Sequence, residues 1–357
     1  MAIKIWMRNR SASLSASPAD SMSAWLHRAN AAYYGRRFGV DVDPETETAV
    51  TLGSKEGLAN LASAITAPGD VILVPNPSYP IHPYGFIIAG AELRAVPQGP
   101  GRDFLAGFKQ AVESSTKPPS AVVLNYPSNP TAQVVDLDFY GEMVAFCRHH
   151  NIYILSDLAY AEIYFNDPPP SILQVPGARD IAVEFTSASK TYSMPGWRIG
   201  FATGNRGLIH ALTRIKSYLD YGAFTPIQVA TAAALNGSQD CVDDVRALYR
   251  RRRDVLVQAM NVAGWEIPTP TATMFAWAPI PEEMAWMGSL EFAKQLLACA
   301  EVAVSPGIGF GVYGEGYVRI ALVENEQRIR QAARSVRRFL SSPPMVSGEG
   351  SAKAVAL

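Results

Sequence analysis

The chain has 357 residues, of which 48% are hydrophobic, a length that suits a large α/β domain followed by a smaller one. Its 31 basic and 32 acidic residues leave a formal net charge of −1, so neither nucleic acid nor an anionic membrane is expected as its main partner. No apolar run reaches about 18 residues, so we expect no transmembrane helix.

The first half of the chain alternates short apolar runs with helical patterns. Residues 1–28 are interpreted as an atypical N-terminal segment, and residues 29–240 as a large α/β domain. Apolar strands separated by helices are typical of parallel sheets covered on both faces, so the sheet should be mainly parallel. The predicted strands lie at 71–74, 121–124, 152–155, 181–185 and 199–202, and the predicted helices at 55–66, 136–149 and 206–221.

The pattern changes after about residue 224. A long helix is predicted at 240–263, and residues 241–340 are interpreted as a smaller α+β domain. Residues 341–357 are small, polar and rich in proline and glycine, which predicts a disordered tail. The remaining predicted elements of this half are strands at 274–277 and 317–322 and helices at 289–300 and 326–340.

The cysteine spacing argues against a metal site. Cys147, Cys241 and Cys299 are odd in number and far apart, with no Cys-x-x-Cys or Cys/His pattern. We therefore expect no metal, inert thiols and a reduced, cytoplasmic location.

A lysine follows one predicted strand in a string of small hydroxyl residues. Lys190 is preceded by Ser187 and Ser189, and Arg198 follows eight residues later. A lysine amine forms a Schiff base with an aldehyde, and the serines with Arg198 suit a phosphate. A lone lysine would be interpreted as a solvated loop residue, but the complete string favours chemistry.

Three further segments carry polar residues, and ligands of open α/β sheets bind at the carboxyl ends of strands. Asp157 ends a predicted strand, where its carboxylate needs a cationic partner, and Tyr160 follows it. Pro130 holds Asn129 in an extended conformation. Gly53, Ser54 and Lys55 open a predicted helix, whose N-terminus suits phosphate. Taken singly, these would be an N-cap, an Asn-Pro turn and a capping serine.

Together, these strings resemble the fold-type I aminotransferases of class I/II, and among them the bacterial alanine (glutamate–pyruvate) transaminases. The resemblance extends over roughly residues 33–340. It implies the fold type I of pyridoxal-phosphate-dependent transferases, a mainly parallel large domain with a smaller α+β domain, and a homodimer. The strings that carry it include residues 77–82, 129–131, 157–160, 187–190, 196–198, 215–218, 305–310 and 318–322.

The resemblance also implies a role for each site residue. Lys190 carries pyridoxal 5′-phosphate as a Schiff base and moves the proton. Asp157 partners the ring nitrogen, Asn129 and Tyr160 hold the ring oxygen, and Tyr79 stacks on the ring. Arg319 clamps the substrate carboxylate, with Asn129 beside it. The phosphate cup consists of Gly53, Ser54, Lys55, Ser187, Ser189 and Arg198.

The implied activity is amino transfer between an amino acid, alanine in the first place, and a 2-oxo acid such as 2-oxoglutarate or pyruvate. One alternative is a β-lyase or decarboxylase on the same fold, because fold does not fix the reaction. The other is a cofactor-binding protein impaired by its short N-terminus, since Ser17 stands where the family has a tyrosine that contacts the partner's cofactor phosphate.

Overall fold

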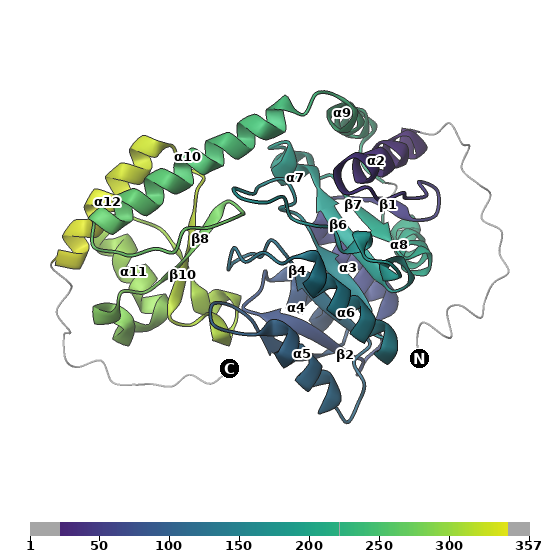
Figure 1. The fold of residues 1–357 in the computed structure, drawn as a ribbon, viewed down its shortest axis with the longest axis horizontal. Coiled ribbons are helices and arrows are strands. Elements are labelled where there is room, and N and C mark those ends of the chain that lie inside the picture. Colours follow the sequence, from purple (N-terminus) through teal and green to yellow (C-terminus); the bar gives the residue numbers. More distant parts are fainter. Residues whose placement is uncertain (1–21, 221, 342–357) are drawn as a thin grey trace.

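A seven-stranded sheet forms the core of the larger of two units (Figure 1). The computed structural model describes residues 22–220 and 222–341, so Ser17 and the tail expected after residue 341 lie outside the described residues. The sheet has the order β1-β7-β6-β5-β4-β2-β3. Its strands are β1 (Thr48–Thr51), β2 (Val71–Asn76), β3 (Glu92–Pro97), β4 (Ala121–Asn125), β5 (Tyr153–Asp157), β6 (Ala182–Ser187) and β7 (Gly200–Gly204).

The sheet is mainly parallel, as predicted, and β7 alone runs against the others. It pairs antiparallel with both β6 and β1. The connection from β6 to β7 contains only a four-residue helix, α7 (Ala188–Thr191), and a 3-10 turn. Parallel neighbours need a longer crossover, so the chain returns beside β6 in the opposite direction.

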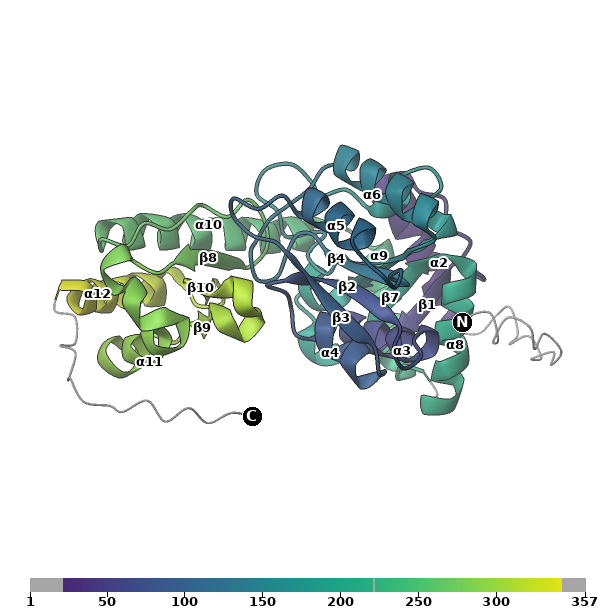
Figure 2. The same cartoon turned by 90° about the horizontal axis from the view of Figure 1, so that it is seen from below.

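Helices cover both faces of this sheet (Figures 1 and 2). The burial pattern explains why: in β4, Val122 and Leu124 pack into one core cluster, while Ala121 and Val123 pack into the other. Alternate residues of a strand point to opposite faces, and both faces are therefore apolar. The helices are α2 (Met22–Phe38), α3 (Ser54–Ile65), α4 (Ile81–Ile88), α5 (Phe104–Glu113), α6 (Leu137–His150), α8 (Arg206–Leu219) and α9 (Thr225–Asn236).

A second unit with its own core lies beyond α9. The 23-residue helix α10 (Asp240–Val262) leads to an antiparallel sheet of order β8-β10-β9. Trp265, Phe292 and Val336 are among the residues buried in this core. The elements are β8 (Phe275–Pro279), α11 (Gly288–Ala300), β9 (Ser305–Pro306), β10 (Tyr317–Ala321) and α12 (Glu326–Ser341).

The beginning of the large unit differs from the expected boundary after residue 28. Helix α2 runs continuously across that position, and Leu26 and Tyr34 are both fully buried in the same core. Residues 24–28 therefore share the helix and the packing of the residues that follow. The pattern is weak in the sequence because α2 also carries several polar and charged residues, including Arg36 and Arg37.

Candidate active site

The polar residues identified in the sequence lie at the carboxyl ends of neighbouring strands. β4 ends at Asn125, β5 at Asp157 and β6 at Ser187. The register pairs Asn125 with Asp157, and Asn125 Nδ2 donates a hydrogen bond of 2.8 Å to Asp157 O. Since ligands of such sheets bind at this edge, the three strand ends mark the candidate site.

Asp157 is buried, and its carboxylate is held from two sides. Oδ2 lies 3.0 Å from Nε2 of His82, on α4, and Oδ1 accepts a hydrogen bond of 3.2 Å from Ala159 N. The His82 side chain is fully buried, and its Nδ1 has no partner among the described residues. His82 belongs to the string at residues 77–82, and nothing in the sequence indicates its contact with Asp157. The Asp157 carboxylate can therefore pair with a cation that binds at the carboxyl end of β5.

Asn129 and Tyr160 lie together beside Asp157. Asn129 N donates a hydrogen bond of 2.9 Å to Asn125 Oδ1, which fixes the loop after β4. Asn129 Nδ2 is 3.4 Å from Tyr160 Oη. Burial raises the pKa of Tyr160 above its usual range, and the Asp157 carboxylate adds to the shift. The phenol therefore remains protonated and available as a hydrogen-bond donor.

Arg319 reaches this group from the other sheet. It lies on β10, and its Nη1 donates a hydrogen bond of 2.8 Å to Asn129 Oδ1. Its Nη2 donates to Ser305 Oγ at 3.3 Å, while Nε has no partner among the described residues. The guanidinium carbon is 4.3 Å from the ring centroid of Phe275 and 4.7 Å from that of Phe310. This cation has no carboxylate partner in the described chain and can accept an anion.

The positive charges of two arginines act on Lys190. It lies on α7, directly after β6, and no ion pair of its amine occurs among the described residues. Burial lowers the pKa of Lys190 below its usual value, and the positive charges of Arg198 and Arg319 lower it further. The amine is consequently neutral, and hence nucleophilic, over a wider pH range than a free lysine.

The two serines before Lys190 have different partners. Ser187 caps α7, because its Oγ accepts a hydrogen bond of 3.2 Å from Ser189 N, and it also donates to Ile199 O at 3.3 Å. Ser189 Oγ is buried without a partner among the described residues. A buried hydroxyl without a partner is costly, so Ser189 is free to bind an acceptor.

Arg198 folds back onto the start of α3. It adopts a left-handed conformation with φ of 52°, and its Nη2 donates to Leu52 O at 3.3 Å. The guanidinium covers Gly53 so closely that a Cβ atom at Gly53 would overlap it. Gly200, at the start of β7, is also close: a Cβ there would be 2.8 Å from Ser54 N. A helix N-terminus and a guanidinium together bind anions well.

Ser54, Lys55 and Tyr79 complete the predicted set. Ser54 and Lys55 form the first turn of α3, where backbone N–H groups lack helical partners. Lys55 Nζ is 5.9 Å from the ring centroid of Tyr79, and the Tyr79 and His82 ring centroids are 6.0 Å apart. The Lys55 amine therefore lies over the ring of Tyr79. Among the described residues it makes no hydrogen bond.

The arrangement offers four chemical functions within one site. The Asp157 carboxylate can pair with a cation, and the Lys190 amine has a lowered pKa. Anions can bind at Arg319 and at the start of α3. Within residues 22–220 and 222–341, no group of three or more His, Cys, Asp or Glu side chains is placed to hold a metal ion. In the same residues, no helix is both long and apolar enough to cross a membrane.

Known proteins are similar to this chain in sequence and in fold. A putative aminotransferase of Rhizobium meliloti, AatC, is 63% identical over 318 residues, which are 89% of this chain and 78% of that protein. The glutamate–pyruvate aminotransferase AlaC of Escherichia coli is 55% identical over 87% of this chain and 76% of its own length. Among solved structures, BacF from Bacillus subtilis superposes with a TM-score of 0.84 at 34% identity, covering 95% of this chain and 89% of that chain.

The family follows from these similarities. The model of the family described as aminotransferase class I and II matches residues 12–336. Its members use pyridoxal phosphate and have the type I fold, which agrees with the mainly parallel seven-stranded sheet. The resemblance seen in the sequence is therefore confirmed, and this chain belongs to the class I and II aminotransferases.

Proposed function

We propose that this chain transfers an amino group between alanine and a 2-oxo acid, 2-oxoglutarate or pyruvate, using pyridoxal 5′-phosphate held by Lys190. One arrangement carries the proposal: Arg198 folds over the start of α3 and Arg319 contacts Asn129 at the strand ends, and the positive charges of both lower the pKa of the Lys190 amine. The first cation suits a cofactor phosphate and the second suits a substrate carboxylate. The similarity to a glutamate–pyruvate aminotransferase supports the choice of alanine.

The residues present fit the cofactor. Ser189 Oγ is a buried hydroxyl without a partner among the described residues, and the start of α3 under Arg198 offers free N–H groups. These groups suit a phosphate. Tyr79 would pack on the ring, and Asn129 and Tyr160 would hold its oxygen. Gly53, Ser54, Lys55 and Ser187 would line the phosphate together with Ser189 and Arg198.

The residues of the site would have different tasks in the reaction. When bound, pyridoxal phosphate supplies an electron-accepting ring, on which amino-group chemistry depends. Asp157 would hold a proton at the ring nitrogen through its carboxylate. Lys190 would hold the cofactor covalently, and its neutral amine would move the proton at the substrate Cα. Arg319 orients the substrate by its carboxylate.

The activity can be tested directly with the holoenzyme. We would incubate it with a panel of amino acids, each with and without 2-oxoglutarate or pyruvate, and measure product oxo acids and amino acids. The proposal expects alanine and glutamate to be interconverted with their oxo acids, and only when an acceptor is present. Product formation without an acceptor would favour a β-lyase or decarboxylase. Full cofactor occupancy without turnover would favour the impaired cofactor-binding protein.

We further propose that the protein acts as a cytoplasmic homodimer. Three large apolar side chains are exposed around the end of α8: Tyr218 at 73%, Leu219 at 62% and Phe224 at 71%. Apolar residues grouped on a surface are typical of protein interfaces. The three cysteines are free, as suits a reducing compartment. Sedimentation equilibrium measures the dimer, and a monomer at micromolar concentration would contradict it.

The substitution Arg319→Lys should raise the Michaelis constant for every amino acid and oxo acid alike. Lysine retains the charge but loses the planar fork that binds a carboxylate at two points. We expect a loss of roughly 2 kcal/mol, or about thirtyfold, from the scale of charged hydrogen bonds. Steady-state kinetics with several substrates measures it. If the Michaelis constant rises for one substrate alone, Arg319 binds that substrate's side chain and not the carboxylate that all substrates share.

The substitution Gly53→Ala should weaken cofactor binding by about 10- to 100-fold. Its Cβ would displace Arg198, and a charge-assisted hydrogen bond contributes roughly 1.5–3 kcal/mol. Gly39→Ala is the matched control, because Gly39 also has a positive φ, +66° against +88°, but nothing within 4 Å of its Cβ position. Titration of both apo-proteins with pyridoxal phosphate measures the difference. Equal affinities would show that Arg198 does not hold the phosphate.

A further inference from the structure

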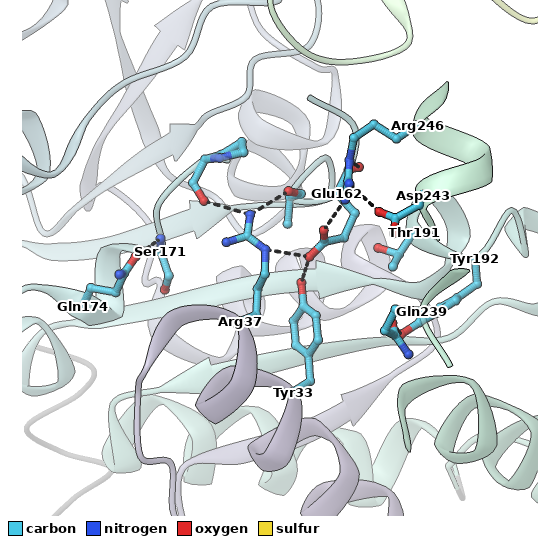
Figure 3. Close-up of polar contacts among 12 residues, drawn as sticks. Tyr33, Arg37, Glu162, Ser171, Gln174, Thr191, Tyr192, Gln239, Asp243 and Arg246 are labelled. Carbon is cyan, nitrogen blue, oxygen red and sulfur yellow. Dashed lines mark hydrogen bonds and ion pairs between the residues drawn. The ribbon is translucent and has the colours of Figure 1, made fainter. Parts of the chain in front are cut away.

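A buried carboxylate, Glu162, lies where three segments of the chain meet (Figure 3). Its Oε1 accepts hydrogen bonds from Tyr33 Oη at 2.7 Å and Arg37 Nε at 3.0 Å, both on α2. Its Oε2 accepts one from Arg246 Nη2 at 3.1 Å, on α10. The side chains of Glu162, Arg37 and Arg246 are 7%, 19% and 17% exposed. Water screens these ion pairs little, so breaking one has a large effect.

The segment that carries Glu162 connects the two sheets. Residues 158–165 leave β5 directly after Asp157 and include Tyr160. Their far end is paired with residues 271–273, which lead into β8, by two backbone hydrogen bonds of 2.8 Å. β8 in turn pairs with β10, which carries Arg319. The same junction holds a small buried cluster of Tyr160, Ile163, Phe165, Met274 and Phe275.

Helix α10 is attached to the large unit at its first turns. Gln239, just before the helix, accepts a hydrogen bond of 2.9 Å from the hydroxyl of Tyr192, two residues after Lys190 (Figure 3). Arg246, within the helix, binds Glu162. The far half of α10 packs into the core of the small sheet through Leu256 and Met260. A helix of 23 residues is stiff and spans roughly 34 Å, so its anchored end determines where the small sheet lies.

We propose that the Glu162–Arg246 pair is a positioning device that places Arg319 against Asn129 and Tyr160. It would act through α10 and the small sheet, without touching the substrate, and would set the affinity for the substrate carboxylate. The inference rests on the proposed role of Arg319. The Glu162–Arg37 pair is its internal control, because α2 packs into the core of the large sheet together with Leu158 and Ala161, whereas α10 leads to the other unit.

The experiment compares Arg246→Gln with Arg37→Gln in the holoenzyme. Each removes one guanidinium from the same carboxylate, at similar burial, and leaves the other in place. Both should lower the thermal midpoint of unfolding to a similar degree. Only Arg246→Gln should raise the Michaelis constants for amino and oxo acids, by about 3- to 30-fold, with kcat little changed. Only Arg246→Gln should weaken binding of glutarate, an unreactive dicarboxylate, by the same factor in calorimetry.

The outcomes separate this inference from the proposed function. Wild-type protein that does not bind glutarate would overturn the role of Arg319, and this inference with it. Binding by the wild type with equal losses in both variants, or with none, would show that Glu162 only stabilises the fold. If Arg246→Gln does not fold, Arg246→Lys replaces it, since lysine keeps the charge. If Arg246→Lys then binds glutarate with an affinity between those of Arg37→Gln and Arg319→Lys, the positioning role is supported. If it binds as tightly as Arg37→Gln, the positioning role is overturned.

Discussion

Replacing Lys190 with alanine should abolish amino transfer and the covalent retention of pyridoxal phosphate. The Lys190 amine can both bind an aldehyde and, when neutral, move a proton at carbon. Its pKa is lowered by burial and by the charges of Arg198 and Arg319, which favours the neutral, reactive form. We expect a loss of at least about 10⁴-fold in kcat, or about 5 kcal/mol.

The measurement for Lys190→Ala combines turnover with chemical labelling. Borohydride reduction of the wild-type holoenzyme should fix the cofactor on the peptide that contains Lys190, and on no peptide of the variant. Lys294→Ala is the control, because Lys294 is on the exposed surface, with a side chain 62% exposed. Non-covalent affinity of the variant should persist through Arg198 and the start of α3. Label on a different lysine would contradict the assignment.

Residues close in sequence were predictable, because local strings carry their own geometry. Lys190 follows Ser187 and Ser189 within one short helix after β6, and the string alone indicated its role. The parallel strands were likewise visible as apolar runs, since they are buried on both faces. The edge strand β3 was not, because five of its six residues are exposed or only partly buried and its sequence contains no apolar run.

Contacts between distant residues were beyond the reach of sequence reasoning. His82 meets Asp157 across 75 positions, and nothing near either residue indicates the contact. Arg319 meets Asn129 across 190 positions, and only the family resemblance predicted that they share a site. Arg246 of α10 and Arg37 of α2 lie in no recognisable motif, yet both contact the buried Glu162. Such pairs depend on how two sheets and a long helix are placed, which local patterns do not encode.

The contact between His82 and Asp157 leads to the second large effect. The substitution Asp157→Asn should reduce kcat by roughly 10³-fold, or about 4 kcal/mol, from the scale of a single preorganised electrostatic contact. An amide keeps the shape and can accept from Ala159 N, but it carries no charge to favour a proton on the ring nitrogen. Cofactor affinity should fall less than tenfold, because the phosphate contacts and Lys190 are untouched.

A second variant separates the charge of Asp157 from its orientation. His82→Gln keeps the carboxylate and offers an amide near the position of the imidazole Nε2, which now lies 3.0 Å from Asp157 Oδ2. It should cost only about tenfold in kcat, the scale of one hydrogen bond to a charged group. Stopped-flow rates of the first half-reaction, with apo-protein titrations for affinity, distinguish the two variants. Near-normal rates in Asp157→Asn would show that the carboxylate does not hold the ring proton. Equal losses in both variants would mean that orientation of Asp157 by His82, and not its charge alone, limits the reaction.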